Sequence, residues 1–304
     1  MKAFQRFALF NLVFSLLVIV WGAYVRASGS GAGCGQHWPL CNGEVLPTPE
    51  RIQTVVEFVH RASSGLSLIF VVVALFWSYR LADKNSLVRR AAGLSVVAIF
   101  LEAILGAGLV LLKLVEFDQS VKRAISISLH SANTLFLVAS LASLVWLSKR
   151  EEAFRGEKNP TVFPVKPYFK FTLFAFIALA MCGAITALGD TLFPAISLKA
   201  GWEADLAVSA HFLLRLRIIH PLLAVVWIGL VFGWTQKLEG AGLHSARNYL
   251  LVAVVSQFVL GILNWMLMAP NALQMLHLLI ADLVFISFWI SGLEYEARKS
   301  SHTA

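Results

Sequence analysis

Four histidines recur at comparable positions in separate apolar segments, and their type and spacing indicate iron chemistry. They are His60, His130, His220 and His277. Polar side chains inside a membrane are costly and usually face the interior of a helix bundle. Two histidines on facing helices can place ring nitrogens on opposite faces of one haem iron, whereas histidines spread over four helices form no compact zinc cluster. A hydrogen bond to a neighbouring carbonyl would explain any one of them, but four in register favour two haem sites.

A carboxylate lies beside the first histidine. Glu57 precedes His60 by three residues, so the two side chains share one helical face. A carboxylate there can handle protons or stabilise a developing cation beside bound haem. Its spacing to Arg61 also fits an i, i+4 salt bridge, and the sequence leaves both roles open. Glu102, within another apolar segment, either serves a proton path or packs at the interior position that Gln257 takes later in the chain.

Two cysteines and four arginines complete the candidate groups. Cys34 and Cys41 are seven positions apart in a short loop with glycine and proline, which suits a disulfide in an oxidising compartment. Such a bridge either holds the loop or takes part in thiol exchange, and we favour the structural role. Haem propionates need cations, and guanidinium groups match carboxylates well, although snorkelling to lipid headgroups is the alternative. The arginines near outer helix ends are Arg26, Arg61, Arg215 and Arg217.

The composition requires that lipid covers much of the molecule. Of the 304 residues, 58% are hydrophobic and 14% are charged, with a mean hydropathy of +0.75. A soluble domain carries roughly 25% charged residues. The net charge of +8 fits basic loops facing an anionic cytoplasmic leaflet. We therefore expect the lipid bilayer, and no nucleic acid, as a partner.

Eight apolar runs are long enough, at about 20 residues, to cross the hydrocarbon core. We predict an all-α integral membrane protein whose transmembrane helices lie near 7–26, 57–80, 91–112, 124–147, 169–189, 212–235, 248–268 and 272–293. The first run is longer than the apolar core of about 7–15 residues in a secretory signal, and we expect it to be retained.

The two halves of the chain look like one unit used twice. Short motifs recur in the same order: Gly22-Ala23 and Gly183-Ala184, Glu102 to Gly106 and Gln257 to Gly261, and the histidine pairs. We predict a four-helix bundle at 1–148, a polar cytoplasmic linker at 149–168 and a second four-helix bundle at 169–304. The parallel repeat implies a pseudo-twofold axis along the membrane normal.

The distribution of lysine and arginine predicts the orientation. Most of the 25 basic residues lie in segments on the side that carries both termini, so both termini are predicted to be cytoplasmic. The segments near 27–56, 113–123 and 190–211 then lie outside, and all four histidines fall in the outer leaflet. The outer side would be the periplasm or its equivalent.

A specific combination of motifs resembles the bacterial haem A synthases. It comprises the segment Gly33–Leu46 (GCGQHWPLCNGEVL) followed by Glu57-Phe-Val-His60-Arg61 and Gly65, and the likeness extends over nearly the whole chain. That family oxidises the C8 methyl group of haem O to a formyl group through successive hydroxylations, giving the haem A of terminal oxidases. The resemblance implies haem O and haem A as ligands, with haem O synthase and an electron donor as partners, and it is compatible with an oligomer.

The resemblance also assigns roles to the candidate residues. It implies that His60 and His130 flank the substrate haem, that Glu57 is the essential carboxylate, and that Cys34 and Cys41 are the family's first cysteine pair. It further implies that a resident haem b, bound by His220 and His277, passes electrons to the substrate site. Some members carry a second cysteine pair between residues 190 and 211; this chain has none, so a role specific to that pair does not apply.

Two other functions would use the same histidines. One is a di-haem b-type membrane cytochrome that moves electrons from quinol to a partner. The other is a carrier that delivers haem to an oxidase without altering it. Glu57 and the cysteine loop favour the enzyme, because a pure electron carrier needs neither.

Overall fold

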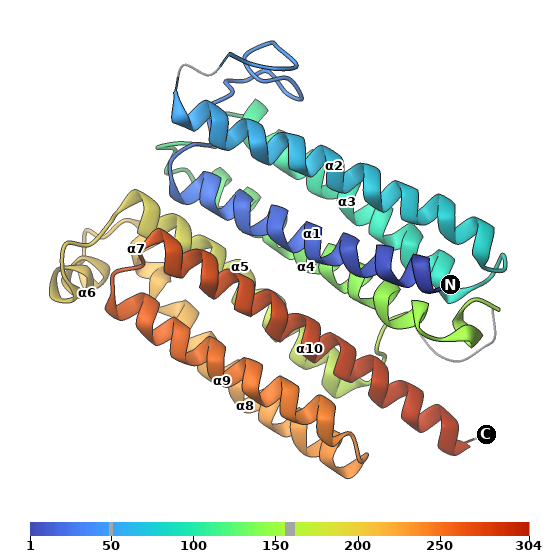
Figure 1. Cartoon of the computed structure of the whole chain (residues 1–304). Helices are drawn as coiled ribbons and strands as arrows, with labels where there is room; N and C mark the ends of the chain where they lie inside the picture. The colour runs from blue at the N-terminus through green and yellow to red at the C-terminus, as the bar shows by residue number, and fades with distance from the viewer. Residues whose placement is uncertain (49–50, 156–161, 304) are drawn as a thin grey trace.

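A computed structural model describes residues 1–48, 51–155 and 162–303 of the chain. Within these residues the regular structure is helical (Figure 1). The elements are α1 (Lys2–Ala27), α2 (Ile52–Leu81), α3 (Leu87–Leu111), α4 (Val121–Ser148), η1 (Glu151–Ala153), α5 (Pro167–Leu192), α6 (Leu198–Leu206), α7 (Phe212–Arg217), α8 (Ile219–Gly240), α9 (His244–Met266) and α10 (Asn271–Thr303).

Eight segments of the described chain are long and apolar enough to cross a membrane, and they correspond to the eight predicted runs. The all-helical, multi-pass class is therefore confirmed. The helices extend past the apolar runs because polar residues continue the backbone hydrogen bonds beyond the lipid core. The predicted run 212–235 is divided into α7 and α8 at Ile218. Pro221 has no N–H to give to the carbonyl of Arg217, which accounts for the break.

Serines and a proline set several helix starts. The Ser86 hydroxyl accepts a hydrogen bond from the backbone N–H of Arg89 at the start of α3, and Ser120 does the same for Arg123 at the start of α4. Pro167 occupies the first turn of α5, where its missing N–H costs nothing. These signals end the preceding loops and mark where α3, α4 and α5 begin.

The helices pack as two neighbouring groups, and Figure 1 shows α1–α4 beside α5 and α8–α10. The groups meet through α1 and α4 on one side and α5 and α10 on the other. A buried hydrogen bond of 2.8 Å crosses this boundary, from the Trp289 indole N–H to the Ser143 hydroxyl. The two helix groups are therefore joined by packing and by a buried hydrogen bond. The predicted domain limits and pseudo-twofold axis stay predictions.

The second group is packed around a glycine where the start of α5 meets α10. Gly292 on α10 faces Phe169 on α5, and a Cβ at residue 292 would lie 2.4 Å from Phe169 Cε2 and 2.7 Å from Pro164 Cγ. Phe169 is itself fully buried and stacked on Phe288, with ring centroids 4.3 Å apart. The aromatic ring has no room to retreat, so α5 and α10 approach closely here only because residue 292 lacks a side chain.

Gly292→Ala is expected to destabilise the purified protein by about 1–3 kcal/mol, the usual cost of overpacking a core. Thermal unfolding in detergent measures the change. Gly229→Ala on α8 is the matched control, because a Cβ there meets no heavy atom within 4 Å. Equal unfolding temperatures for the two variants would contradict this account of the α5–α10 contact.

Candidate haem sites

Each candidate histidine ring lies against a glycine of the preceding membrane helix, and the contact is closest for the first histidine of each pair. A Cβ added to Gly22 on α1 would lie 2.7 Å from Cε1 of His60 on α2. A Cβ added to Gly183 on α5 would lie 2.8 Å from Cε1 of His220 on α8. Any larger residue at either position would displace the ring. The Gly-Ala motifs of the sequence therefore have a physical reason in both halves.

The second histidine of each pair faces a glycine in the same way. The Cβ position of Gly106 on α3 is 3.8 Å from Cε1 of His130 on α4, and that of Gly261 on α9 is 3.2 Å from Cε1 of His277 on α10. The Leu-Gly motifs of the sequence supply these two positions. All four imidazoles are thus set between closely approaching helices, which holds their rings in fixed places.

The pair in the second half is spaced for one iron between two rings. The ring centroids of His220 and His277 are 6.5 Å apart. Because a metal–imidazole bond is about 2 Å long, two rings on opposite sides of one iron have centroids separated by roughly 6 Å. His220 Nδ1 lies 3.3 Å from the Leu179 carbonyl oxygen, which leaves Nε2 for a ligand. Nε2 of His277 lies 3.1 Å from the Gln257 amide nitrogen, so this amide must turn aside when that ring nitrogen binds iron.

The pair in the first half is formed by His60 on α2 and His130 on α4, which are close enough to interact electrostatically. Nδ1 of each ring, like Nδ1 of His277, is buried and forms no hydrogen bond with the described residues, although Oε2 of Glu102 lies 3.5 Å from Nδ1 of His130. Unpaired buried nitrogens are costly unless a further group completes the site. The buried ring nitrogens without hydrogen bonds fit a metal with a preference for imidazole, such as haem iron.

Glu57 is buried, with 3% of its surface exposed, and both of its oxygens are occupied. Oε2 accepts a hydrogen bond of 2.7 Å from the Cys34 backbone N–H. Oε1 accepts from Arg61 through Nη2 at 2.5 Å and Nε at 3.0 Å. The salt bridge suggested by the spacing is therefore present. It also connects the carboxylate to the loop after α1 (residues 28–48), which is called the outer loop after its predicted side of the membrane.

The outer loop is closed by the predicted disulfide between Cys34 and Cys41, whose Cα atoms are 4.4 Å apart. Both cysteines are buried. Arg61 donates from Nη1 to the carbonyl oxygens of His37 and Leu40, at 2.9 and 2.5 Å. One guanidinium thus holds the loop and the Glu57 carboxylate together. Because the sulfurs are shielded by the folded loop, the contacts favour a structural role for the bridge.

Two of the other candidate arginines are used in contacts between outer segments. Arg26 donates to the Ala187 carbonyl at 2.6 Å and to the Thr191 hydroxyl at 2.7 Å, and so ties α1 to α5. Arg217 pairs with Asp190 at 3.1 Å and Asp205 at 3.4 Å. Their assignment to haem propionates stays a prediction, as do the assignments of Arg61 and Arg215.

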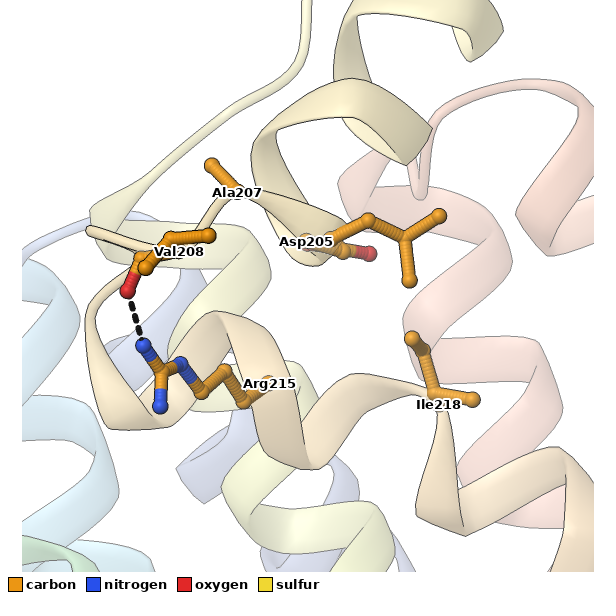
Figure 2. Close-up of a pocket in the computed structure, with 6 residues that line it drawn as sticks. Asp205, Ala207, Val208, Arg215 and Ile218 are labelled. Atoms are coloured by element: carbon orange, nitrogen blue, oxygen red, sulfur yellow. Dashed lines mark hydrogen bonds between the residues drawn. The ribbon is translucent and has the colours of Figure 1, made fainter.

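An open hollow of about 440 Å³ lies under α6 at the outer surface, lined in part by Asp205, Arg215 and Ile218 (Figure 2). Figure 2 shows the Arg215 guanidinium turned toward the Val208 carbonyl, to which it donates a hydrogen bond. Burial raises the pKa of the Asp205 carboxyl above its ordinary value, and Arg217 acts in the opposite direction. None of the four candidate histidines lines this hollow, which is formed where the end of α6 and the loop after it pack over α7.

One functional candidate was not singled out from the sequence. Asp282 on α10 is buried, and its Oδ2 has no hydrogen-bond partner among the described residues. It interacts electrostatically with Glu102 of the other helical group. The available signal was an aspartate inside the apolar run 272–293, but hydropathy does not tell which helix such a residue faces.

The fold and the histidine pairs define a multi-pass helical membrane protein with paired intramembrane imidazoles. Residues 5–289 match the COX15-CtaA family model, which is described as cytochrome oxidase assembly protein. Since the match covers almost the whole chain, the protein belongs to this family.

Several similar proteins bear names that indicate haem chemistry. The chain is 28% identical over 295 residues to the haem A synthase of Shouchella clausii, covering 93% of this chain and 94% of the relative. It is 29% identical over 297 residues to the haem A synthase of Halalkalibacterium halodurans, with the same coverages. It is 39% identical over 299 residues to a protohaem IX farnesyltransferase of Thermus thermophilus, covering 95% of this chain but 48% of that protein. The chain therefore spans about half the length of the Thermus relative.

Arg61→Ala is expected to expose the disulfide to reductant. Losing charge-assisted hydrogen bonds worth about 1.5–3 kcal/mol should speed reduction by roughly tenfold or more. The measurement is the rate at which a membrane-impermeant phosphine makes Cys34 and Cys41 available for alkylation, followed by mass spectrometry of the loop peptide. Arg51→Ala, at an exposed arginine at the start of α2, is the control. Unchanged reduction rates in Arg61→Ala would show that the loop stays closed without this guanidinium.

Proposed function

We propose that this chain is a haem A synthase, an oxidoreductase that converts the C8 methyl group of haem O to a formyl group. Family membership and the relatives named haem A synthase support this activity. The observation that carries it is the buried Glu57, which lies one helical turn from His60 and is held by the disulfide loop. An electron carrier has no use for a fixed carboxylate beside one of its two histidine pairs.

The two halves differ where the reaction would need them to differ. Glu57 stands three residues before His60, whereas the residue three before His220 is Arg217. A carboxylate that can accept a proton therefore accompanies the first pair alone. We assign His60 and His130 to the substrate haem O, and His220 and His277 to a resident haem b.

The proposed chemistry replaces a C–H bond of the methyl group by C–OH in two successive two-electron oxidations, after which the geminal diol loses water to leave the aldehyde. The oxygen atom would come either from dioxygen, which takes two electrons and two protons from outside and leaves its second oxygen atom as water, or from water, in which case two electrons and two protons leave to an acceptor. Bound haem b would supply one-electron redox chemistry to the substrate site. The residues of the chain would hold the reacting methyl group in place, with His60 and His130 holding the macrocycle. Glu57, whose oxygens already accept hydrogen bonds from Arg61 and from the Cys34 N–H, would stabilise a developing positive charge, or would take a proton once one of these donors moves away. Lipid and the closed outer loop limit the entry of water.

The partners follow from the same proposal. The Thermus relative bears the name of a farnesyltransferase acting on protohaem IX and is about twice as long as the region it shares with this chain. Farnesylation of protohaem yields haem O, so a haem O synthase acting beside this protein in the membrane would supply its substrate. An electron donor is also required. We place the protein in the bacterial inner membrane with both termini cytoplasmic, on the distribution of its basic residues.

The test is conversion of haem O in cells that make this chain together with a haem O synthase. Extracted haems are separated by chromatography and identified by mass. We expect haem A or its hydroxylated precursor with the wild-type chain. Glu57→Gln should lower product at least about 100-fold, the typical contribution of a general acid or base, while the b-type haem spectrum is retained. Glu44→Gln, in the same outer loop, is the control.

Two results would contradict the proposal in different ways. Unchanged haem O with a haem-loaded wild-type protein and a working electron supply would favour the di-haem cytochrome. Wild-type conversion by Glu57→Gln would leave the enzyme in place but return Glu57 to the role of anchor for the outer loop.

A further inference from the structure

The residue beside the second histidine differs between the two halves. Glu102 on α3 and Gln257 on α9 each stand four positions before the glycine that faces the histidine. Oε2 of Glu102 lies 3.5 Å from Nδ1 of His130. The amide nitrogen of Gln257 lies 3.1 Å from Nε2 of His277. The same place in the repeat therefore holds a carboxylate in one half and a neutral carboxamide in the other.

The carboxylate is fixed by a polar clamp on α4. The Asn133 amide nitrogen lies 2.6 Å from Oε2 of Glu102 and donates to it. The Thr134 hydroxyl lies 2.5 Å from Oε1. Each carboxylate oxygen of Glu102 therefore has a side-chain partner on α4, and the Thr134 hydroxyl also lies 2.9 Å from the His130 carbonyl oxygen. Asn133 and Thr134 follow His130 by three and four residues, so the same helical face presents the ring and the clamp.

The second half has no such clamp. The residues three and four after His277 are Ile280 and Ala281, neither of which has a side-chain donor. Oε1 of Gln257 is buried without a hydrogen-bond partner in the described structure. Among the described residues, these side-chain partners on the histidine-bearing helix are thus present only in the half that contains the carboxylate, and they hold that carboxylate beside His130.

A carboxylate near the outer nitrogen of a ligating imidazole has a known physical effect. It fixes the tautomer with the proton on Nδ1, directs Nε2 at the metal and makes the ring a stronger electron donor. Stronger donation stabilises the oxidised iron and lowers its reduction potential, and outer hydrogen bonding is one of the means by which a protein adjusts haem. A neutral amide at the equivalent position supplies no negative charge.

We propose that Glu102 is a positioning residue that orients His130 and lowers the reduction potential of haem iron in the first half relative to iron in the second half, where Gln257 takes its place. The inference rests on the proposed haem sites. It adds an electronic difference between two otherwise repeated sites: the half that contains Glu57 holds an electron-rich iron suited to oxidation chemistry, and the other half holds an iron that accepts electrons more readily.

The test exchanges the two side chains in the full-length protein. The His277→Ala background removes the second haem site, and the His130→Ala background removes the first. The site that remains is loaded with protohaem IX, and its midpoint potential is measured by a redox titration followed by visible absorbance. In the first site, Glu102→Gln should raise the midpoint potential by about 59 mV or more, which is a tenfold change in a one-electron equilibrium. In the second site, Gln257→Glu should lower the midpoint potential.

Glu102→Asp and Asn133→Ala separate charge from packing. The aspartate variant keeps the negative charge and should stay nearer the wild-type potential than Glu102→Gln. Asn133→Ala loosens the carboxylate and should shift the potential in the same direction as Glu102→Gln, by less. Bound haem content of each variant shows that its site is intact.

The possible failures are distinguishable. If protohaem binds the first site and its potential is the same with glutamate and glutamine at position 102, the inference is wrong and the proposed function is untouched. If the first site of the His277→Ala protein binds neither protohaem nor haem O, the proposed substrate site is wrong, and the inference is lost with it.

Discussion

The close approach of a backbone to each histidine ring is the constraint on which the rest of the structure depends. An imidazole inside a membrane must be buried against protein, because lipid offers no hydrogen bonds. Gly22 and Gly183 give His60 and His220 this space, since a Cβ at either glycine would lie under 3.0 Å from the ring. Small residues let membrane helices approach closely, and here that closeness sets the ring positions from which a ligand site can be built.

On this repeated frame the two halves have acquired different polar groups. The first half carries Glu57 with its disulfide-closed loop, and a clamped carboxylate, Glu102, beside His130. The second half has Arg217 and Gln257 in the corresponding places. The carboxylates therefore accompany the first histidine pair, and the proposed division between a substrate haem and a resident haem rests on this difference.

Much of this was predictable from the sequence, and the parts that were not share a cause. The eight membrane helices follow from apolar length, and the Cys34–Cys41 disulfide from the loop composition. The Gly-Ala and Leu-Gly motifs were visible as repeats, but their reason required the helix contacts. Two contacts could not be predicted because they depend on which sides of the helices pack together. One joins Arg61 to the loop carbonyls, and the other is the electrostatic interaction of Asp282 with Glu102. A hydropathy value averages over all sides of a helix and therefore does not show which side meets a neighbouring helix. The roles of the histidines and arginines as ligands stay predictions.

An experimental structure of the protein purified with its haem tests the central claim most directly. The account predicts a porphyrin between the rings of His220 and His277, with iron bonded to both imidazoles, Gly183 and Gly261 still against the rings, and the Gln257 amide turned away from Nε2. A second porphyrin, when haem O is supplied, should lie between His60 and His130 with Glu57 beside it. Haem bound outside both histidine pairs, or iron held by other side chains, would contradict the account.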